Sequence, residues 1–389
     1  MCYMNSLKLL EDLVAIRSDL HAKGAGGHFE YEVATFLKKY IQKNLPHLVI
    51  EEQEIESGRF NLFVHDGSPV SLLFCGHMDC VEEGSGWTYN VRGERKGSRL
   101  YGRGSADMKA GLVTMIAALD QAAKTGKKGV AALFYCDEDY DFLGMRKFVK
   151  AYADRIKPKM VVSPEPTNGL LSAATRGIVE FHVTMKGKTG HAAKPKTGID
   201  AFKGFMSGVD GIKELLEGKE DPVLGTPNLN IAMIRCGALQ GYANDEVQSP
   251  LFGSMGNVIP DHCEAIVELR TIPGINHQNI LNAFHAGVKR HRAIVDSCKT
   301  KINLGSYATP REQLQLVEEV YEEVIGPVAY QSILDTGYYD TQMMEEVWKI
   351  PVVCWGPKGK NAHGCDEYVE IPSVEKLERA FRMLVDRWA

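Results

Sequence analysis

Apolar residues in the first part of the chain alternate between helical and strand periodicities. Helical spacing covers Leu7 to Ile16 and Tyr31 to Leu45, and a helix of about 18 residues is expected to begin near Met108. Three further segments are continuous apolar runs typical of strands buried on both faces: Ser71 to Cys75, Val130 to Cys136 and Met160 to Val162. Strands that alternate with helices predict right-handed crossovers, so we expect an α/β fold with a mostly parallel sheet flanked by helices.

The pattern changes after Arg176. From Ile178 to Lys186 apolar and polar residues alternate, which we interpret as an exposed antiparallel edge strand. A helix, two strands and another helix are expected next: Gly198 to Glu217, Asn230 to Cys236, Cys263 to Arg270 and His277 to Arg290. Helical spacing returns near Thr309, and Ile350 to Trp355 predicts another buried strand. We therefore expect an α/β domain made of residues 1–177 and 306–389, interrupted by a smaller α+β domain at residues 178–305.

Composition narrows the class of protein. The 389 residues are 44% hydrophobic and 24% charged, which is ordinary for a globular chain. The net charge of −5 gives no basic excess, so neither nucleic acid nor a membrane surface is expected as a partner. Met1 to Asn5 lacks a basic segment followed by an apolar stretch, as a secretory signal would have. The nine cysteines show no CxxC spacing and suggest scattered reduced thiols, so we expect a cytoplasmic enzyme.

Acids and histidines gather at the ends of the predicted elements. Three segments directly follow the buried strands: His77-Met78-Asp79, Asp137-Glu138-Asp139 and Pro164-Glu165-Pro166. Asp107 leads into the long helix, and His363 lies in a segment after the last predicted strand. Ligands of open α/β sheets bind beyond the carboxyl ends of the strands, so we expect these side chains to converge.

Imidazole and carboxylate groups without a thiolate suit zinc, cobalt or manganese. A carboxylate shared by two cations roughly 3.5–4 Å apart is a common arrangement for activating water. Taken singly, Asp107 could be a helix N-cap, and the acids at 138 and 139 could form a solvated loop. Together the segments favour a metal site in which one acid of the Glu138-Asp139 pair is a ligand and the other a base. The neighbouring cysteines are expected to be small core residues: Cys75, Cys80, Cys136 and Cys365.

The order of these motifs resembles that of the two-zinc amidohydrolase and exopeptidase superfamily. This superfamily includes acetylornithine deacetylase, succinyl-diaminopimelate desuccinylase, aminoacylase and peptidase T. The resemblance covers nearly the whole chain, from Leu9 to about Leu384. It implies a zinc-exopeptidase-like catalytic domain and an inserted domain that acts as a lid and dimerisation domain.

The resemblance also implies two divalent metal ions, zinc in the first place and cobalt or manganese as alternatives. The implied ligands are His77 and Glu165 for one ion, Asp139 and His363 for the other, and Asp107 as the bridge. Glu138 is then the general base, and Asp79 orients the imidazole of His77.

Several substrate-binding residues follow from the same resemblance. The segment Gly187 to Pro195 is similar to the superfamily's inserted-domain motif, whose histidine, here His191, binds the reacting carbonyl oxygen. Arg176 matches a position that contacts a substrate carboxylate, and so does Arg270. Asn257, at the start of the segment that ends in Arg270, is also expected to bind the substrate.

Two departures from the superfamily's pattern stand out. Asp139 occupies a position where members commonly carry glutamate, which is expected to alter metal preference rather than abolish binding. Gly337-Tyr338-Tyr339-Asp340 replaces a Gly-Thr-Ser-Asp-like substrate loop, so Tyr338 and Tyr339 are expected to reshape the pocket.

The implied reaction is hydrolysis of the amide bond of a small N-acyl amino acid, as in deacetylases and desuccinylases, with Glu138 activating the metal-bridging water. A dipeptidase or carboxypeptidase acting on a short peptide is the alternative. An inactive homologue that only binds a small molecule is a more distant one, which the intact Glu138 disfavours. The resemblance further implies a homodimer through the inserted domain, with His191 reaching the metal site of the other subunit.

Overall fold

The computed structural model describes residues 5–19, 30–56, 58–245 and 248–389. Met1 to Met4, on which the prediction about a secretory signal depends, lie outside the described residues. The chain divides into two compact units: unit 1, Met1–Ala173 with Thr309–Ala389, and unit 2, Ala174–Ala308. None of the described helices has the length and apolar character that a membrane span requires.

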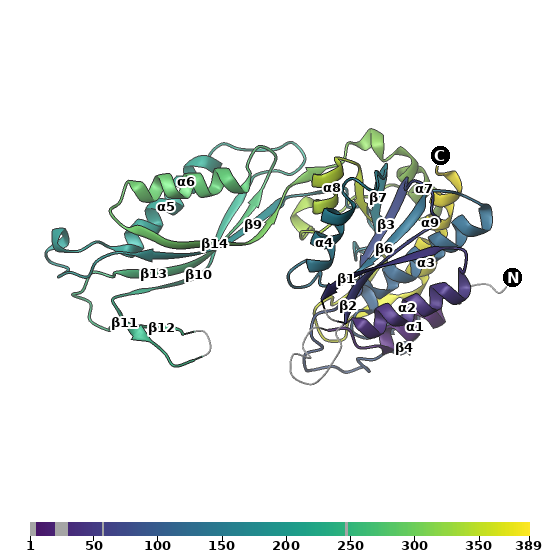
Figure 1. The fold of residues 1–389 in the computed structure, drawn as a ribbon, viewed down its shortest axis with the longest axis horizontal. Helices are drawn as coiled ribbons and strands as arrows, with labels where there is room; N and C mark the ends of the chain where they lie inside the picture. The colour runs from purple at the N-terminus through teal and green to yellow at the C-terminus, as the bar shows by residue number, and fades with distance from the viewer. Residues whose placement is uncertain (1–4, 20–29, 57, 246–247) are drawn as a thin grey trace. The chain divides into compact units, whose positions relative to one another are not determined.

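Unit 1 is built on a six-stranded sheet with the strand order β1-β2-β6-β3-β7-β16 (Figure 1). Neighbouring strands are parallel over one part of this sheet: β6 (Val130–Tyr135), β3 (Leu72–His77), β7 (Met160–Ser163) and β16 (Val352–Cys354). The remaining two strands are antiparallel: β1 (Val49–Glu56) and β2 (Arg59–His65). The runs predicted as buried strands form the parallel part, which confirms the α/β architecture.

Helices cover both faces of this sheet (Figure 1). One core joins the sheet to α1 (Ser6–Ala15), α2 (Tyr31–Asn44), α3 (Ala110–Thr125), α7 (Gln315–Val324) and α9 (Ile371–Arg387). The other face packs against α4 (Leu143–Tyr152), which contacts α8 (Gln342–Trp348). Phe74 of β3 meets Phe381 of α9 at 5.0 Å between ring centroids, and Phe63 of β2 meets Phe148 of α4 at 5.4 Å. Because both faces are covered, the central strands are apolar at successive positions.

A small four-stranded sheet was missed by the sequence analysis. Its order is β17-β18-β5-β4, with β4 at Glu94–Lys96, β5 at Arg99–Tyr101, β17 at Gly359–Lys360 and β18 at Tyr368–Glu370. The loop between β17 and β18 carries His363, and β5 leads into the turn η1 (Ser105–Lys109) that carries Asp107. This sheet therefore brings two distant parts of the chain to the site described below.

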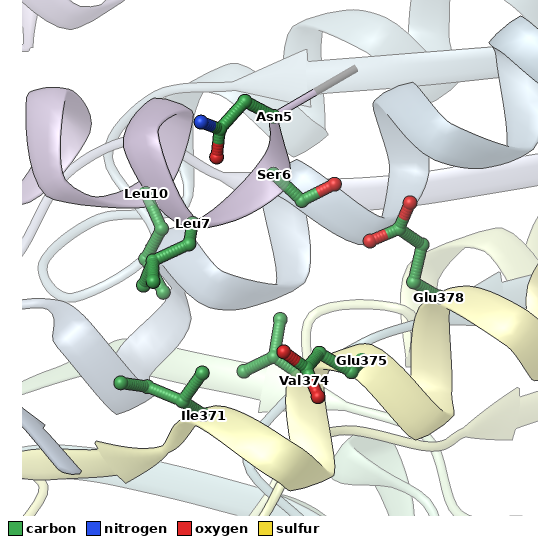
Figure 2. Close-up of a pocket in the computed structure, with 8 residues that line it drawn as sticks. All are labelled: Asn5, Ser6, Leu7, Leu10, Ile371, Val374, Glu375 and Glu378. Atoms are coloured by element: carbon green, nitrogen blue, oxygen red, sulfur yellow. The ribbon is translucent and has the colours of Figure 1, made fainter. Parts of the chain in front are cut away.

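A cavity of about 490 Å³ opens between the start of α1 and the start of α9 (Figure 2). Leu7, Leu10 and Val374 line its apolar side, and the carboxylates of Glu375 and Glu378 lie at its edge. None of the site residues predicted from the sequence lines this cavity, so it is unrelated to the acid and histidine motifs.

Unit 2 is an antiparallel sheet with helices on one face. The strand order is β10-β13-β9-β14, with β9 at Gly177–Lys186, β10 at Asn228–Gly237, β13 at His262–Thr271 and β14 at Ile294–Leu304. Two helices pack on it, α5 (Ala201–Leu216) and α6 (His277–Lys289), with Phe284 of α6 against Phe181 of β9 at 5.6 Å. The short elements of unit 2 are β8 (Ala174–Thr175) paired with β15 (Tyr307–Ala308), the hairpin β11 (Leu239–Tyr242) with β12 (Pro250–Phe252), and the 3-10 turn η2 (Pro195–Thr197). Two further 3-10 turns, η3 (Arg311–Gln313) and η4 (Ile333–Asp335), belong to unit 1.

The prediction that Ile178 to Lys186 forms an edge strand is wrong. This segment is β9, which pairs with β13 on one side and with β14 on the other. Since helices cover one face of the sheet, a central antiparallel strand shows the same alternation of apolar and polar residues as an edge strand. The edges of the sheet are β10 and β14.

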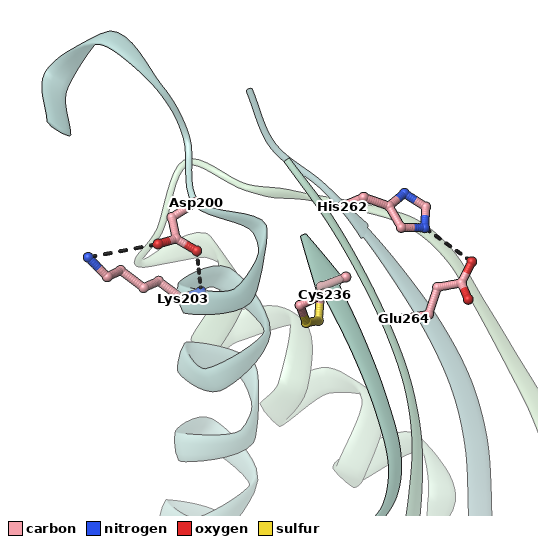
Figure 3. The surroundings of a disulfide bond; sticks show 6 residues. Asp200, Lys203, Cys236, His262 and Glu264 are labelled. Atoms are coloured by element: carbon pink, nitrogen blue, oxygen red, sulfur yellow. Dashed lines mark hydrogen bonds and ion pairs between the residues drawn. A yellow bond between two sulfur atoms is a disulfide. The ribbon is translucent and has the colours of Figure 1, made fainter. Parts of the chain in front are cut away.

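The prediction that all nine cysteines are reduced thiols is also wrong. Cys236 of β10 and Cys263 of β13 are directly opposite each other and form a disulfide (Figure 3). They are 27 residues apart in sequence, so CxxC spacing gives no sign of the pair. Cys365, expected in the core, is exposed, whereas Cys75, Cys80 and Cys136 are buried as expected.

Candidate metal centre

His77 is the last residue of β3, and its side chain is buried. Its Nδ1–H donates to the backbone carbonyl of Asp79 at 3.0 Å, which turns Nε2 towards the acids. The Asp79 carboxylate is farther from this nitrogen, at 3.7 Å. Nε2 lies 3.1 Å from Oδ1 of Asp107 and 3.9 Å from Oε1 of Glu165, which follows β7. The turn after β3 therefore fixes which imidazole nitrogen enters the cluster.

The carboxylate of Asp107 lies between two imidazoles. Oδ1 is 3.1 Å from Nε2 of His77, and Oδ2 is 3.1 Å from Nε2 of His363. α3 begins only at Ala110, and its N-cap position is Lys109. The interpretation of Asp107 as a helix cap is therefore wrong, because its side chain is turned to the histidines and its backbone angles are not helical.

His363 completes the other side of the cluster. Its Nε2 is 3.3 Å from Oδ1 of Asp139, and the side chain is half exposed, unlike that of His77. Asp139 follows β6, and its backbone N–H donates to Oδ2 of Asp79 at 3.0 Å. The Asp79 carboxylate thus joins the loop after β3 to the loop after β6. This hydrogen bond fixes the position of Asp139 relative to His77.

Two groups of donor atoms lie within 4.8 Å of one another: His77 with Asp107 and Glu165, and His77 with Glu138 and Asp139. Imidazole nitrogens and carboxylate oxygens at this spacing match the ligand chemistry of zinc, cobalt and manganese. The structure therefore contains a candidate metal site built from the residues that the sequence motifs singled out.

Burial and mutual repulsion dominate the electrostatics of the acids. Burial raises the pKa of Glu138 and of Glu165 well above the usual carboxylate range, and nearby carboxylates raise both further. Burial also raises the pKa of Asp139 to about 7. For Asp107 burial acts in the same direction, but hydrogen bonds from His363 and His77 outweigh it and lower the pKa. Such a group of buried and partly buried acids is compatible with cations between them, and the donor set fits divalent metal ions.

Glu367 contacts the backbone of the turn that carries Asp107. The sequence analysis did not identify this residue. Its carboxylate is buried and accepts hydrogen bonds from the backbone N–H groups of Gly104, Ala106 and Asp107 at 2.9–3.1 Å. Arg103 also donates to it at 2.6 Å. Because these partners are about 260 residues apart in sequence, no local spacing signals the contact. Glu367 therefore fixes the backbone of the turn that presents Asp107.

A second buried pair lies beside the cluster. The hydroxyl of Tyr135, the last residue of β6, donates to Oδ1 of Asp340 at 2.7 Å. Burial raises the pKa of Asp340 to about 7. The ring of Tyr135 also contacts His77, at 6.3 Å between ring centroids. Asp340 belongs to the Gly337–Asp340 loop of the sequence analysis, but its contact with Tyr135 was not foreseen.

A pocket of about 640 Å³ opens over the cluster. Asp107, Glu138, Asp139, Glu165 and His363 line one side of it. Five residues of the segment after α7 also line it: Gln331, Asp335, Gly337, Tyr338 and Tyr339. Four of the five predicted ligands and the predicted base therefore border a cavity that can admit a small molecule, whereas His77 is buried behind them; the two tyrosines are part of the cavity wall.

The other predicted substrate residues lie in unit 2. His191 is exposed, and its Nδ1 accepts a hydrogen bond from the backbone N–H of Ala193 at 3.1 Å. Asn257 lies opposite the same loop, where its carbonyl accepts from the N–H of Ala192 at 2.8 Å. Arg270 is on β13, and Arg176 directly precedes β9. The substrate roles of these four residues stay predictions.

The chain is similar to several known proteins in sequence and in fold. Acetylornithine deacetylase from Photorhabdus laumondii is 26% identical over 348 residues, which cover 85% of this chain and 83% of that protein. Aminopeptidase PepT from Bacillus cereus has a similar fold, with a TM-score of 0.73 at 18% identity over 98% of each chain. The YXEP protein of Bacillus subtilis, a dinuclear metal binding peptidase, gives a TM-score of 0.65 at 15% identity over 98% of this chain and 96% of that one.

The sequence profile of Peptidase family M20/M25/M40 matches residues 73–387. This range includes His77, Asp107, Glu138, Asp139, Glu165 and His363. The chain therefore belongs to Peptidase family M20/M25/M40 and is a hydrolase of the amidohydrolase and metallopeptidase type.

Proposed function

We propose that the protein hydrolyses the amide bond of a small N-acyl amino acid with the help of two divalent metal ions. The observation that carries this proposal is the carboxylate of Asp107, whose two oxygens each lie 3.1 Å from a different imidazole. A carboxylate in that position is suited to bridging two cations. The similarity to an acetylornithine deacetylase over 85% of the chain supports a deacylase in particular.

In this proposal the ligands are His77 and Glu165 for one ion, Asp139 and His363 for the other, and Asp107 between them. Zinc is the expected metal, with cobalt or manganese as alternatives, because the donors are nitrogen and oxygen. When bound, such a pair of cations lowers the pKa of water and polarises the carbonyl of the substrate. Asp79 positions His77 through its carbonyl and the Asp139 backbone through its carboxylate.

Glu138 is the proposed general base. It lies in the same 4.8 Å group as His77 and Asp139, and it lines the pocket where a substrate amide would sit. From there its carboxylate takes a proton from the attacking water and returns it to the leaving amine. No lysine or arginine lines the described pocket, so Glu138 is not neutralised by a fixed cationic side chain there.

A substrate screen tests the proposal. Acetyl-, succinyl- and formyl-amino acids are compared with unblocked dipeptides after chelation and reloading with zinc, cobalt or manganese. Metal-dependent turnover of acylated amino acids is the expected result. Turnover of dipeptides alone would favour an exopeptidase, and the absence of metal-dependent turnover on both classes would contradict an active hydrolase.

The two tyrosines of the pocket wall are expected to select the substrate. Tyr338 packs edge-on against Phe142 at 5.8 Å, and the hydroxyl of Tyr339 contacts Gln331 at 3.3 Å. Replacing them together, Tyr338→Thr with Tyr339→Ser, should change KM and the substrate ranking several-fold because the wall loses two rings but no metal ligand. Metal content measured in parallel should not change. An unchanged ranking across the screen would show that the rings do not contact the substrate.

We also propose that two copies associate through unit 2 and that His191 completes the site of the partner copy. Both edge strands of this sheet carry exposed apolar side chains, Ile234 on β10 at 42% exposure and Ile294 on β14 at 66%. Exposed strand edges are natural pairing surfaces. An edge of this sheet therefore takes the place that the sequence analysis gave to Ile178 to Lys186.

Mixing of two inactive variants tests the shared site. His191→Ala should lower kcat with the metals retained, because an oxyanion donor acts mainly in the transition state. After subunit exchange with Glu138→Gln, part of the activity should return, since one site of the hybrid combines an intact Glu138 with an intact His191. A monomer in sedimentation, or proven exchange without recovered activity, would contradict the proposal.

A further inference from the structure

The loop that carries Glu138 and Asp139 is closed by contacts outside the proposed metal site. It runs from Cys136, which follows β6, to Gly144 at the start of α4. The buried side chain of Asn61 on β2 holds both ends of this loop. Its Oδ1 accepts from the N–H of Cys136 at 3.1 Å, and its Nδ2 donates to the carbonyl of Gly144 at 2.9 Å. A Cβ atom at Gly144 would collide with the carbonyl oxygen of Cys136, so the two ends are in direct contact.

The carboxylate of Asp137 holds the inside of this loop together. Its Oδ2 accepts hydrogen bonds from the backbone N–H groups of Asp141 at 3.2 Å and Leu143 at 3.1 Å. The backbone of Asp137 is in the left-handed region, with a φ of 70°, which residues other than glycine adopt rarely and at a cost in free energy. The hydrogen bonds of its carboxylate therefore stabilise a backbone conformation that is unfavourable by itself.

Arg59, the first residue of β2, fixes the carboxylate of Asp137. Its Nη2 donates to Oδ1 of Asp137 at 2.7 Å and to Oε1 of Glu30 at 3.1 Å. These three side chains are buried, with at most 6% of each exposed. Nη1 of Arg59 also contacts Glu56 at 3.2 Å, but that side chain is 57% exposed. A buried guanidinium forms charge-assisted hydrogen bonds of fixed geometry, so Arg59 links the loop to the sheet.

Glu138 depends on its backbone for its position. Among the residues that the structure describes, none forms a hydrogen bond or an ion pair with its carboxylate. The residues on either side of it are both fixed, Asp137 by Arg59 and Asp139 by the hydrogen bond from its N–H to Asp79. We infer that Arg59 is a positioning residue for Glu138, because its pair with Asp137 sets the backbone from which the base reaches the pocket. This inference rests on the proposed hydrolysis, in which Glu138 is the base.

Two variants break the pair from its two sides. Arg59→Met removes the guanidinium, and Asp137→Asn keeps the shape of the acid without its charge. Each should lower kcat about 10-fold or more and change KM less than about 3-fold, because a displaced base slows the chemical step while the pocket wall stays intact. Both metal ions should be retained, since Asp139 keeps its hydrogen bond to Asp79. Arg59→Met leaves two acids buried without the guanidinium, so Asp137→Asn provides the test if that variant does not fold.

Glu30→Gln and Glu56→Gln are the matched controls, because each changes a different carboxylate on the same guanidinium. Glu30 is buried, so its variant should lower the unfolding temperature but keep kcat within about 2-fold of the wild type. Glu56 is exposed, and its variant should change neither quantity. A purely structural role of Arg59 predicts instead an unchanged kcat of the folded protein in every variant. Arg59→Lys returns a cation to the side of Asp137 and should recover part of the kcat that Arg59→Met loses.

Hydrogen exchange of the metal-free protein tests the loop without any turnover. The amides of Asp141 and Leu143 should exchange about 10-fold faster or more in Arg59→Met and in Asp137→Asn than in the wild type, because they lose a fixed acceptor. Glu30→Gln controls for a general loss of stability and should leave these amides near the wild-type rate.

Unchanged exchange of these amides would overturn the inference, and so would faster exchange with an unchanged kcat in the folded, metal-loaded variants. Slower turnover together with faster exchange in Arg59→Met and Asp137→Asn, but not in the two controls, would support it. A wild type without metal-dependent turnover would contradict the proposed function, and the exchange rates would still decide whether Arg59 holds the loop.

Discussion

Glu138→Gln is expected to lower kcat by about 10²-fold or more while the protein keeps nearly its full metal content. The amide has almost the shape of the carboxylate but cannot take a proton from water. Glu138 lies beside His77 and Asp139 and lines the pocket, so the exchange alters the reacting centre directly. Steady-state kinetics on the best acylated amino acid of the screen, with metal analysis of the same sample, measures both quantities.

Metal analysis is decisive for this variant because the Glu138 carboxylate lies close enough to the donor atoms of its neighbours to share a metal ion with them. Its donor atom and those of His77 and Asp139 all lie within 4.8 Å of one another, so a role as ligand is a real alternative. Loss of one metal equivalent would show that Glu138 is a ligand, and wild-type turnover would show that it is not the base. Glu346→Gln, an exposed acid on α8 that does not line the pocket, is the matched control and should change neither quantity.

The parallel part of the sheet could be predicted because its signal is local. Val130 to Tyr135 and Leu72 to His77 are buried at every position, and continuous apolar runs of this length are typical of strands covered on both faces. Their carboxyl ends lie at one edge of the sheet, since β6, β3 and β7 are neighbours. This is why acids and histidines from separate segments could be expected to meet before any contact between them was known.

The contacts that support the site could not be predicted in the same way. Glu367 accepts from the backbone of Asp107, and Tyr135 donates to Asp340, across about 260 and 205 residues of sequence. Neither contact follows from a periodicity, because each depends on how loops from different strands approach each other. The position of β9 in its sheet was mistaken for a related reason. Alternation of apolar and polar residues indicates that one face of a strand is covered. The number of strands beside it depends on segments elsewhere in the chain.

Asp107→Ala is expected to impair metal binding more than loss of an outer ligand such as Glu165. The Asp107 carboxylate contacts both imidazoles at 3.1 Å, whereas Glu165 approaches only His77, at 3.9 Å. A carboxylate between two cations binds both and partly cancels their repulsion, so its loss weakens both sites together. Activity should fall by at least about 10²-fold, as for loss of the base.

Metal content after dialysis, with Glu165→Ala treated in parallel, distinguishes this role from a purely structural one. α3 begins at Ala110 without a side-chain cap from Asp107, so helix content and unfolding temperature of the metal-free variant should stay close to those of the metal-free wild type. A helix cap would give the opposite pattern, with both metals retained and about 1 kcal/mol of stability lost. Two tightly bound ions in Asp107→Ala would therefore refute the bridge, since no other described carboxylate lies within 4.0 Å of both His77 and His363.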